Sequence, residues 1–331
     1  MKAIEIIRPG GPEVLRLCER PEPEVGPGEV LIRVAAASVN RPDIQQRKGL
    51  YDPPPGASDI PGLDMAGIVE RVGPGVGRYQ PGDRVCALAT GGGYAELCAV
   101  PEEQVMPLPD GLDMVEAASL PEVFFTAWHN VFQLSRLGQG ETLLILGGTS
   151  GVGLAATQMA RVLRNARVFA TAGTDEKCRV SEQYGAERCV NYRDPEWHQQ
   201  LSALLGTRGF DVILDSQAGD YVGILVEMLA MGGRLALIAN HRGEYSTVRT
   251  RSFVQRSLTL TGAQIRRRDA AFKKRIADEL VRYVWPELTR RRIRTVIQAT
   301  FPLERAAAAQ EILDRNEQIG KVVLIVDPSL V

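Results

Sequence analysis

A glycine-rich turn, set between an apolar run and a run of small residues, is the stretch of this chain best suited to ligand chemistry. It reads LLILGGTSGVGLAATQMA and spans residues 143–160. Glycines permit a tight turn and let the backbone approach a ligand, while the start of a helix offers free N–H groups and a positive dipole end. A strand, a turn and a helix in this order bind the pyrophosphate of a dinucleotide. We therefore expect this contact at Gly148, Ser150, Gly151, Val152 and Gly153.

The turn departs from the usual G-x-G-x-x-G spacing at its second glycine, where Ser150 stands. We expect the Ser150 hydroxyl to offer a hydrogen bond to phosphate instead. A G-x-S-x-G nucleophile turn is excluded because Val152 occupies the position of its last glycine. A glycine turn without a ligand is the alternative interpretation.

The following strand ends indicate which dinucleotide binds. NAD-binding domains place an acid at the tip of the second strand, where it bonds the ribose 2′-hydroxyl. The tip here reads TAGT, and Asp175 lies beyond it, where it is better placed to cap the next helix. A 2′-phosphate, which carries close to two negative charges, favours a cation at this place. We therefore predict NADPH rather than NADH, with its 2′ end at Gly173, Thr174, Lys177 and Tyr192, although a solvated lysine and a strand-end aromatic are the simpler readings of the last two.

Strands alternate with helices around this turn, from residue 123 to 265. The expected strands are 142–147, 166–173, 188–192, 210–216, 233–239 and 258–263. This rhythm predicts a parallel sheet with helices on both faces, a doubly wound Rossmann domain. Ligands bind at the carboxyl ends of such strands, so we add Gln217 and Asn240 to the cofactor site. We place Lys321, in the closing strand, near the cofactor phosphates.

The first third of the chain has a different composition. It holds 16 of the 20 prolines within residues 1–121, and its strand candidates, 29–39, 65–73, 83–89 and 95–101, are short. We expect a β-rich domain at 1–122. A helix at about 269–285 and a strand at 321–326 belong to residues 266–331, which complete it. The fold class is α/β.

Bulk properties limit the possible functions. The chain has 331 residues, a net charge of -1, and 44% hydrophobic and 24% charged residues, as expected of a soluble two-domain protein. No apolar run is long enough for a membrane span and no signal core precedes the first strand, so we expect a cytoplasmic protein. The five cysteines are scattered and the three histidines lie far apart, so we expect neither a disulfide framework nor a metal site.

Two stretches of the first domain resemble the GroES-like catalytic domain of medium-chain dehydrogenases/reductases. They read GPGEVLIRVAAASVNRPD and PGLDMAGIVERVGPGVGRYQPGDRV. The segments GLYDPPPGAS, GTSGVG and IGKVVL extend the resemblance over essentially the whole chain. Within that superfamily the chain resembles the zinc-free quinone oxidoreductases, the zeta-crystallin-like group. The resemblance implies NADPH, a quinone acceptor and a homodimer joined along residues 258–263, an apolar edge strand suited to pairing.

The resemblance also bears on zinc. Zinc-dependent relatives have a cysteine at the place of Asn40 and a histidine at the place of Leu63, and the cysteine-rich lobe of structural zinc is missing between Cys18 and Cys86. Beside Leu63, Asp64 replaces the more usual glutamate, which leaves the local ion pairing open.

A zinc-free site has no Lewis acid, so alcohol oxidation is not expected. A quinone chiefly needs alignment and hydrogen-bond donors for the oxygen that gains charge. The candidate catalytic residues are Asn40, Tyr51 in the YDPPPG loop and Thr126 in FFTAWHN. The simpler roles for these three are an amide that ties a strand end, loop packing and an ordinary helix threonine.

Two other functions fit the same sequence. An NADPH-dependent reductase of enones or other activated double bonds would share the fold and the cofactor. An RNA-binding protein is suggested by residues 242–294, which hold 13 arginines and two lysines against five acids, although a solvated basic face is the simpler interpretation. Steep salt dependence would identify phosphate-driven binding.

Overall fold

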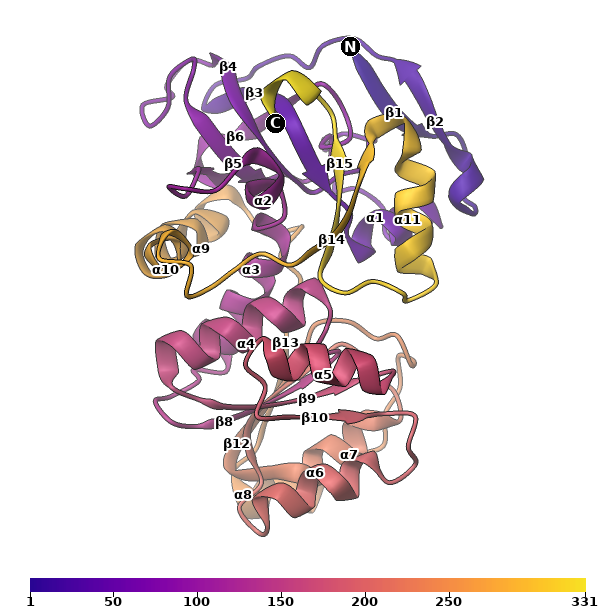
Figure 1. Ribbon diagram of the computed structural model, residues 1–331, viewed down its shortest axis with the longest axis vertical. Helices are drawn as coiled ribbons and strands as arrows, with labels where there is room; N and C mark the ends of the chain where they lie inside the picture. Colours follow the sequence, from indigo (N-terminus) through magenta and orange to yellow (C-terminus); the bar gives the residue numbers. More distant parts are fainter. The chain divides into compact units, whose positions relative to one another are not determined.

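The chain forms two units, one of which is made from both ends of the sequence (Figure 1). The computed structural model describes residues 1–331. The first unit comprises residues 1–125 and 265–331, and the second comprises residues 126–264. From the sequence we expected these boundaries after residue 122 and after residue 265.

The first unit is built on a seven-stranded sheet. Its order is β14-β15-β3-β4-β5-β7, and β6 also pairs with β3. Its strands are β3 (Glu29–Ser38), β4 (Asp64–Val72), β5 (Arg84–Leu88), β6 (Leu97–Pro101), β7 (Val105–Pro107), β14 (Ile297–Pro302) and β15 (Lys321–Ile325), besides the hairpin β1 (Lys2–Ile6) and β2 (Leu15–Glu19). Its helices are α1 (Arg41–Arg47), α2 (Met114–Ala118), α9 (Ala270–Tyr283), α10 (Trp285–Thr289) and α11 (Ala306–Asp314), and α3 (Pro121–Ala127) crosses the boundary. The four short strands expected between residues 29 and 101 are all present.

The second unit is a six-stranded parallel sheet of order β10-β9-β8-β11-β12-β13. Its strands are β8 (Thr142–Leu146), β9 (Arg167–Ala172), β10 (Arg188–Asn191), β11 (Phe210–Asp215), β12 (Leu229–Leu237) and β13 (Thr259–Gly262). Its helices are α4 (Gly151–Arg164), α5 (Asp175–Gln183), α6 (Trp197–Leu205), α7 (Tyr221–Met228) and α8 (Thr250–Arg256). Helices α4 and α5 cover one face of the sheet, and α6 and α7 cover the other (Figure 1). The predicted doubly wound sheet is confirmed, and the order reverses between β8 and β11, where such sheets bind ligands.

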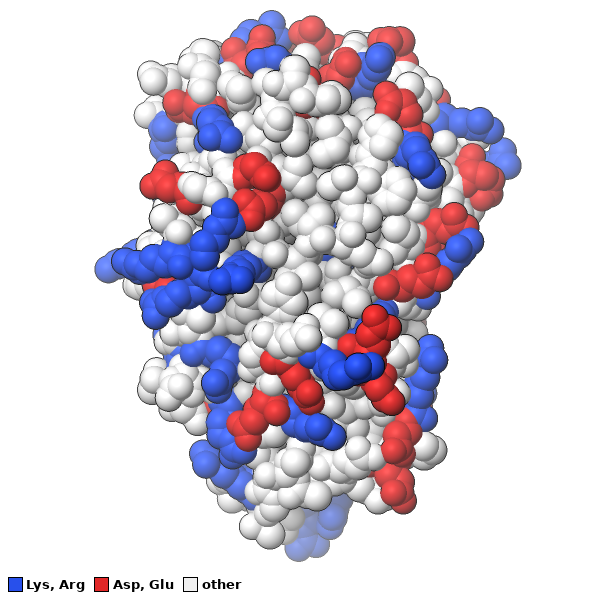
Figure 2. Space-filling view, in the orientation of Figure 1, with Lys and Arg blue, Asp and Glu red and all other residues white.

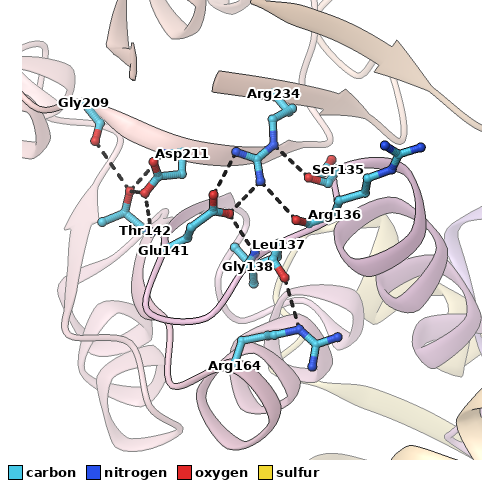
Figure 3. A network of polar contacts seen from close by, with 10 residues as sticks. All are labelled: Ser135, Arg136, Leu137, Gly138, Glu141, Thr142, Arg164, Gly209, Asp211 and Arg234. Atoms are coloured by element: carbon cyan, nitrogen blue, oxygen red, sulfur yellow. Dashed lines mark hydrogen bonds and ion pairs between the residues drawn. The ribbon is translucent and has the colours of Figure 1, made fainter. Parts of the chain in front are cut away.

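A polar network ties the amino ends of the central strands together (Figure 3). Arg234 of β12 donates to both carboxylate oxygens of Glu141, at 2.6 and 3.2 Å, and to the carbonyl oxygen of Ser135 at 2.8 Å. Beside it, the hydroxyl of Thr142 donates to Asp211 of β11 at 2.7 Å. Charge-assisted bonds of this kind are the stronger ones, so the sheet is fixed at the end opposite the glycine turn.

Burial on both faces explains why the strands of the second unit read as apolar runs. All five residues of β8 are buried, and α4 packs the small side chains of its inner face against the sheet. Edge strand β13 is different, because Leu260 is 42% exposed. None of the helices combines the length and the hydropathy needed to cross a bilayer.

Candidate functional site

The glycine turn joins β8 to α4 in the second unit, and Ser150 caps the helix. The Ser150 hydroxyl donates to the carbonyl oxygen of Gly147 at 2.8 Å and accepts from the N–H of Gly153 at 3.0 Å. Gly147 has a φ of 92°, a left-handed conformation that favours glycine. The hydroxyl that we expected to offer to phosphate is therefore engaged within the turn as an N-cap.

Close packing explains the other glycines of the turn. A Cβ on Gly153 would overlap the carbonyl oxygen of Gly147, and a Cβ on Gly148 would lie 2.6 Å from Ala170 Cβ. The first intrahelical bond runs from the N–H of Leu154 to the carbonyl oxygen of Ser150. The N–H groups of residues 151 and 152 precede it, at the positive end of a 14-residue helix. These features fit a pyrophosphate.

The four residues predicted for the 2′ end of the cofactor lie at the ends of β9 and β10 and at the start of α5. A Cβ on Gly173 would lie 2.6 Å from the hydroxyl oxygen of Tyr192, so this phenol stands over the end of β9. Thr174 caps α5 by accepting from the N–H of Lys177 at 3.2 Å. The nearby carboxylate of Asp175 accepts from Asn191 at 2.9 Å. A phenol therefore stands at the end of β9, and the nearby acid already has a partner.

Gln217 and Asn240 follow β11 and β12 at the same edge of the sheet. The N–H of Gln217 donates to Asp215 at 2.6 Å, and its side chain donates to Ser216 at 2.9 Å. The Ser216 hydroxyl donates to the carbonyl oxygen of Leu146, which joins this edge to the end of β8. Burial raises the pKa of Asp215 to about 6, although two backbone N–H groups oppose the rise. Asn240 is exposed.

Thr126 lies in α3, next to a π-helical segment, Trp128–Leu134. Its side chain is half-buried, and its carbonyl oxygen accepts from Asn130 at 2.9 Å. Helices of the π type often occur at functional sites.

Asn40 belongs to a buried cluster of the first unit and has both ends of its amide engaged. Its Nδ2 donates to Asp64 at 2.8 Å, and its Oδ1 accepts from the ammonium of Lys321. The hydroxyl of Ser38 donates to the same oxygen of Asp64 at 2.6 Å. The simpler role considered for Asn40, an amide that ties a strand end, matches this geometry.

Lys321, which we expected near the cofactor phosphates, is only 5% exposed and is bonded within the first unit. Its Nζ donates to Asn40 and lies 3.8 Å from Asp64. The strand β15 pairs with β3, which is why a lysine at the start of β15 meets a residue just past the end of β3. These contacts also settle the ion pairing of Asp64.

Asp43 adds a second buried carboxylate to this cluster. It accepts from the N–H of Asn40 at 2.8 Å, from the N–H of Gly62 at 3.1 Å and from the hydroxyl of Tyr94 at 3.2 Å. Burial raises the pKa of Asp43 to about 6, and nearby Asp64 adds to the rise. A carboxyl that shares a site with another carboxylate holds its proton more firmly.

Tyr51 lies against a residue that the sequence did not single out. The guanidinium of Arg266 stands 5.2 Å from the centre of the Tyr51 ring. Arg266 donates to Gln46 at 2.7 Å and to the carbonyl oxygen of Thr90 at 2.9 Å, whereas its Nη1 has no hydrogen-bond partner although the residue is only 6% exposed. In the sequence Arg266 is one of many arginines in a basic tract, so nothing distinguished it.

Lys273 and Glu122 are further charged residues that sequence reasoning missed. Lys273 is 1% exposed, and its Nζ donates to the carbonyl oxygen of Arg266 at 3.1 Å. Burial lowers its pKa to about 8. The pKa of Glu122 is raised to about 7, first by burial and then by Asp64. Lys273 had one available signal, since it lies one turn before Ile276 and Ala277, on the apolar face of α9.

The arginine-rich tract is partly neutralised by acids. Lys and Arg side chains gather over the region of α9 and α10 (Figure 2). Within this tract, Arg290 and Arg292 both pair with Glu287, and Arg291 pairs with Glu116. A locally compensated surface favours the solvated basic face over a nucleic-acid site.

The two positions at which zinc-dependent relatives carry ligands are occupied here by Asn40 and Leu63. Leu63 is 1% exposed and apolar, and the Asn40 amide is bonded as described. No three His, Cys, Asp or Glu side chains are grouped so that they could hold a metal ion.

Comparisons with known proteins give the family of the chain. Residues 26–110 match the family described as alcohol dehydrogenase GroES-like domain, and residues 151–282 match the zinc-binding dehydrogenase family. The quinone oxidoreductase of Rattus norvegicus is 32% identical over 328 residues, which is 98% of each chain. The Escherichia coli quinone oxidoreductase complexed with NADPH superposes with a TM-score of 0.87 at 26% identity, over 98% of this chain and all of that one. A structure of an NAD-dependent alcohol dehydrogenase superposes with a TM-score of 0.86 at 31% identity, over 99% of this chain and all of that one. The chain therefore belongs to the quinone oxidoreductase branch of the medium-chain dehydrogenase/reductase superfamily.

Proposed function

We propose that this chain is an NADPH-dependent quinone oxidoreductase that works without a metal ion. The observation that carries the proposal is the similarity to quinone oxidoreductases along nearly the whole chain, together with a dinucleotide corner that the structure builds at the expected edge of the sheet. When bound, the dinucleotide supplies the hydride. The chain's own residues bind and orient the reactants.

The choice of NADPH over NADH rests on the ends of β9 and β10. Lys177 follows the Thr174 cap, and the Tyr192 hydroxyl stands over Gly173. The acid at this place, Asp175, accepts from Asn191 and is held away from the role that an acid plays in NAD-binding domains. An ammonium and a phenol favour a phosphate by charge-assisted hydrogen bonding.

Residues of the first unit would bind the acceptor and stabilise the charge that it gains. Tyr51 and Arg266 bring a phenol and a guanidinium together, and both can donate to an oxygen that gains negative charge. Asn40 acts through its neighbours, because its amide holds Asp64 and Lys321 in place. The amide and the buried Leu63 offer poor ligands for zinc, which is why we propose a metal-free reaction.

The direct test is NADPH oxidation with 9,10-phenanthrenequinone. NADH and a short enone are run in parallel, and one cuvette contains a chelator. Turnover of the quinone that prefers NADPH and resists the chelator supports the cofactor, the metal-free reaction and the acceptor together. Enone reduction without quinone turnover moves the function to a double-bond reductase. A preference for NADH in kcat/KM contradicts the cofactor assignment.

A further inference from the structure

We propose that Glu122 is the proton donor for quinone reduction, an inference that rests on the proposed function. A quinone that accepts a hydride gains two electrons and one hydrogen, and it needs one further proton to become a hydroquinone. The residues predicted for catalysis from the sequence do not supply this proton readily. Asn40 and Thr126 carry no acidic proton, and the phenol of Tyr51 is ordinarily a weak acid with a pKa of about 10.

Glu122 is held at the start of α3, and its side chain is half-buried. Its backbone N–H donates to Oδ2 of Asp64 at 3.2 Å, which fastens this end of the helix to the buried cluster around Asn40. Thr126 lies four residues further along the same helix, and residues at this spacing share a face. The backbone of Glu122 is therefore anchored beside the buried cluster of the first unit.

Charged groups from four other elements act on the Glu122 carboxyl. They are Asp64 of β4, Asp43 of α1, Lys321 of β15, Arg266 before α9 and Lys273 of α9. The two carboxylates oppose ionisation of Glu122, and the three cations favour it. Burial adds to the opposition, and the resulting pKa of about 7 leaves the carboxyl partly protonated at neutral pH. General acids work best when their pKa lies near the operating pH.

Arg266 indicates where an acceptor oxygen belongs. Its guanidinium acts on the Glu122 carboxyl and also stands over the Tyr51 ring. Its Nη1 is without a partner although buried donors are normally satisfied. A carbonyl oxygen of the acceptor would satisfy this donor and would then lie among Tyr51, Arg266 and Glu122.

The proton balance is complete with this residue. Hydride addition to the quinone leaves a hydroquinone anion, whose conjugate acid resembles a phenol with a pKa of about 10. The O–H bond of Glu122 breaks, a new O–H bond forms on the product, and Glu122 becomes a carboxylate. Transfer from an acid with a pKa of about 7 is favourable. Water then returns a proton to Glu122 before the next turnover.

The test compares Glu122→Gln with a matched control, Glu304→Gln, whose side chain is exposed in the first unit. The pH dependence of kcat for 9,10-phenanthrenequinone is measured from pH 5.5 to 9, and NADPH binding is measured by fluorescence titration. Wild-type kcat should fall as pH rises above about 7, because the donor loses its proton. E122Q should lose about 100-fold in kcat at pH 6 and show no such fall, with the Kd of NADPH unchanged. E304Q should behave as wild type, and E122D should retain a falling limb.

A wild-type kcat and pH profile in E122Q overturns the proposal, as does a loss of NADPH affinity as large as the loss in kcat. The carboxyl infrared band of the protein without NADPH provides a reading that does not depend on turnover. A band that titrates near pH 7 in wild type and is missing in E122Q supports the assignment, and its absence from wild type overturns it. If the wild type reduces no quinone, the proposed function itself is overturned. If the wild type and E122Q both reduce the quinone normally, only the role of Glu122 is overturned.

Discussion

Gly153→Ala should weaken NADPH binding while the second unit remains folded. The added Cβ would overlap the carbonyl oxygen of Gly147 and lie 3.1 Å from both Gly148 Cα and Ser150 Oγ. The carbonyl would have to retreat by roughly 1 Å to reach an ordinary van der Waals separation. Because the added Cβ would also press on the Ser150 hydroxyl, which caps α4 by accepting from the N–H of Gly153, the N-cap would be weakened as well, at a cost of about 1 kcal/mol in the free energy of unfolding.

A displacement of this size at the pyrophosphate should weaken NADPH binding about 100-fold, since misplacement by about 1 Å can have an effect of that order. This loss corresponds to about 2.7 kcal/mol of binding free energy. Fluorescence titration gives the Kd of NADPH for wild type, G153A and a control, G77A, whose Cβ would meet nothing within 4 Å. Thermal melting checks that each variant is folded. A folded G153A that binds NADPH within twofold of wild type would refute the assignment of this turn.

Three further predictions address the cofactor, the stability and the assembly. Lys177→Ala should raise the Kd of NADPH about tenfold to a hundredfold, because a charge-assisted hydrogen bond contributes about 1.5–3 kcal/mol; the Kd of NADH, titrated in parallel, should stay within twofold. Asp215 has a raised pKa of about 6 against an ordinary value of 3.8, so the folded state binds the proton more tightly than the unfolded state and wild-type stability falls as pH rises through this window. Urea unfolding from pH 4 to 6.5 should show wild type losing up to about 3 kcal/mol relative to Asp215→Asn, and parallel pH curves for the two proteins would contradict the shift. Leu260→Lys on β13 should convert a dimer in light scattering to the 36.2 kDa monomer, and a wild type that is already monomeric would remove the expected interface.

Local patterns predicted the second unit well, and the reason is physical. Parallel strands covered on both faces must be apolar throughout, so a strand such as β8 is visible in the sequence as a continuous run. The glycines of the following turn are equally visible, because no other residue tolerates the close approach between Gly153 and Gly147. Strand β14 was missed because it is only half-buried, with alternate residues exposed, and α11 was missed because its run of alanines carries no clear stop.

The hydrogen-bond partners of polar side chains were harder to predict from the sequence, because the pairing of strands that lie far apart in the chain decides which side chains meet. Asn40 and Lys321 lie 281 residues apart in the chain and meet only because β15 pairs with β3. Ser150 presents a different case, since its type fits both a phosphate contact and a helix cap, and only the geometry of the turn distinguishes the two. Glu122 stands at the start of a helix, where acids are common for a reason unrelated to catalysis, the helix dipole.

The charges of the buried cluster in the first unit also bear on how Glu122 can act repeatedly. The cluster contains three carboxylates and three cations: Asp43, Asp64, Glu122, Lys273, Lys321 and Arg266. The set is neutral when every member is charged, and this balance limits the cost of burying any one of them. The pKa of Glu122 has risen to about 7 and that of Lys273 has fallen to about 8, so the two lie about one unit apart. Lys273, whose charge acts on Glu122, therefore helps to keep the pKa of this carboxyl in the range where water can return the proton that the product has taken.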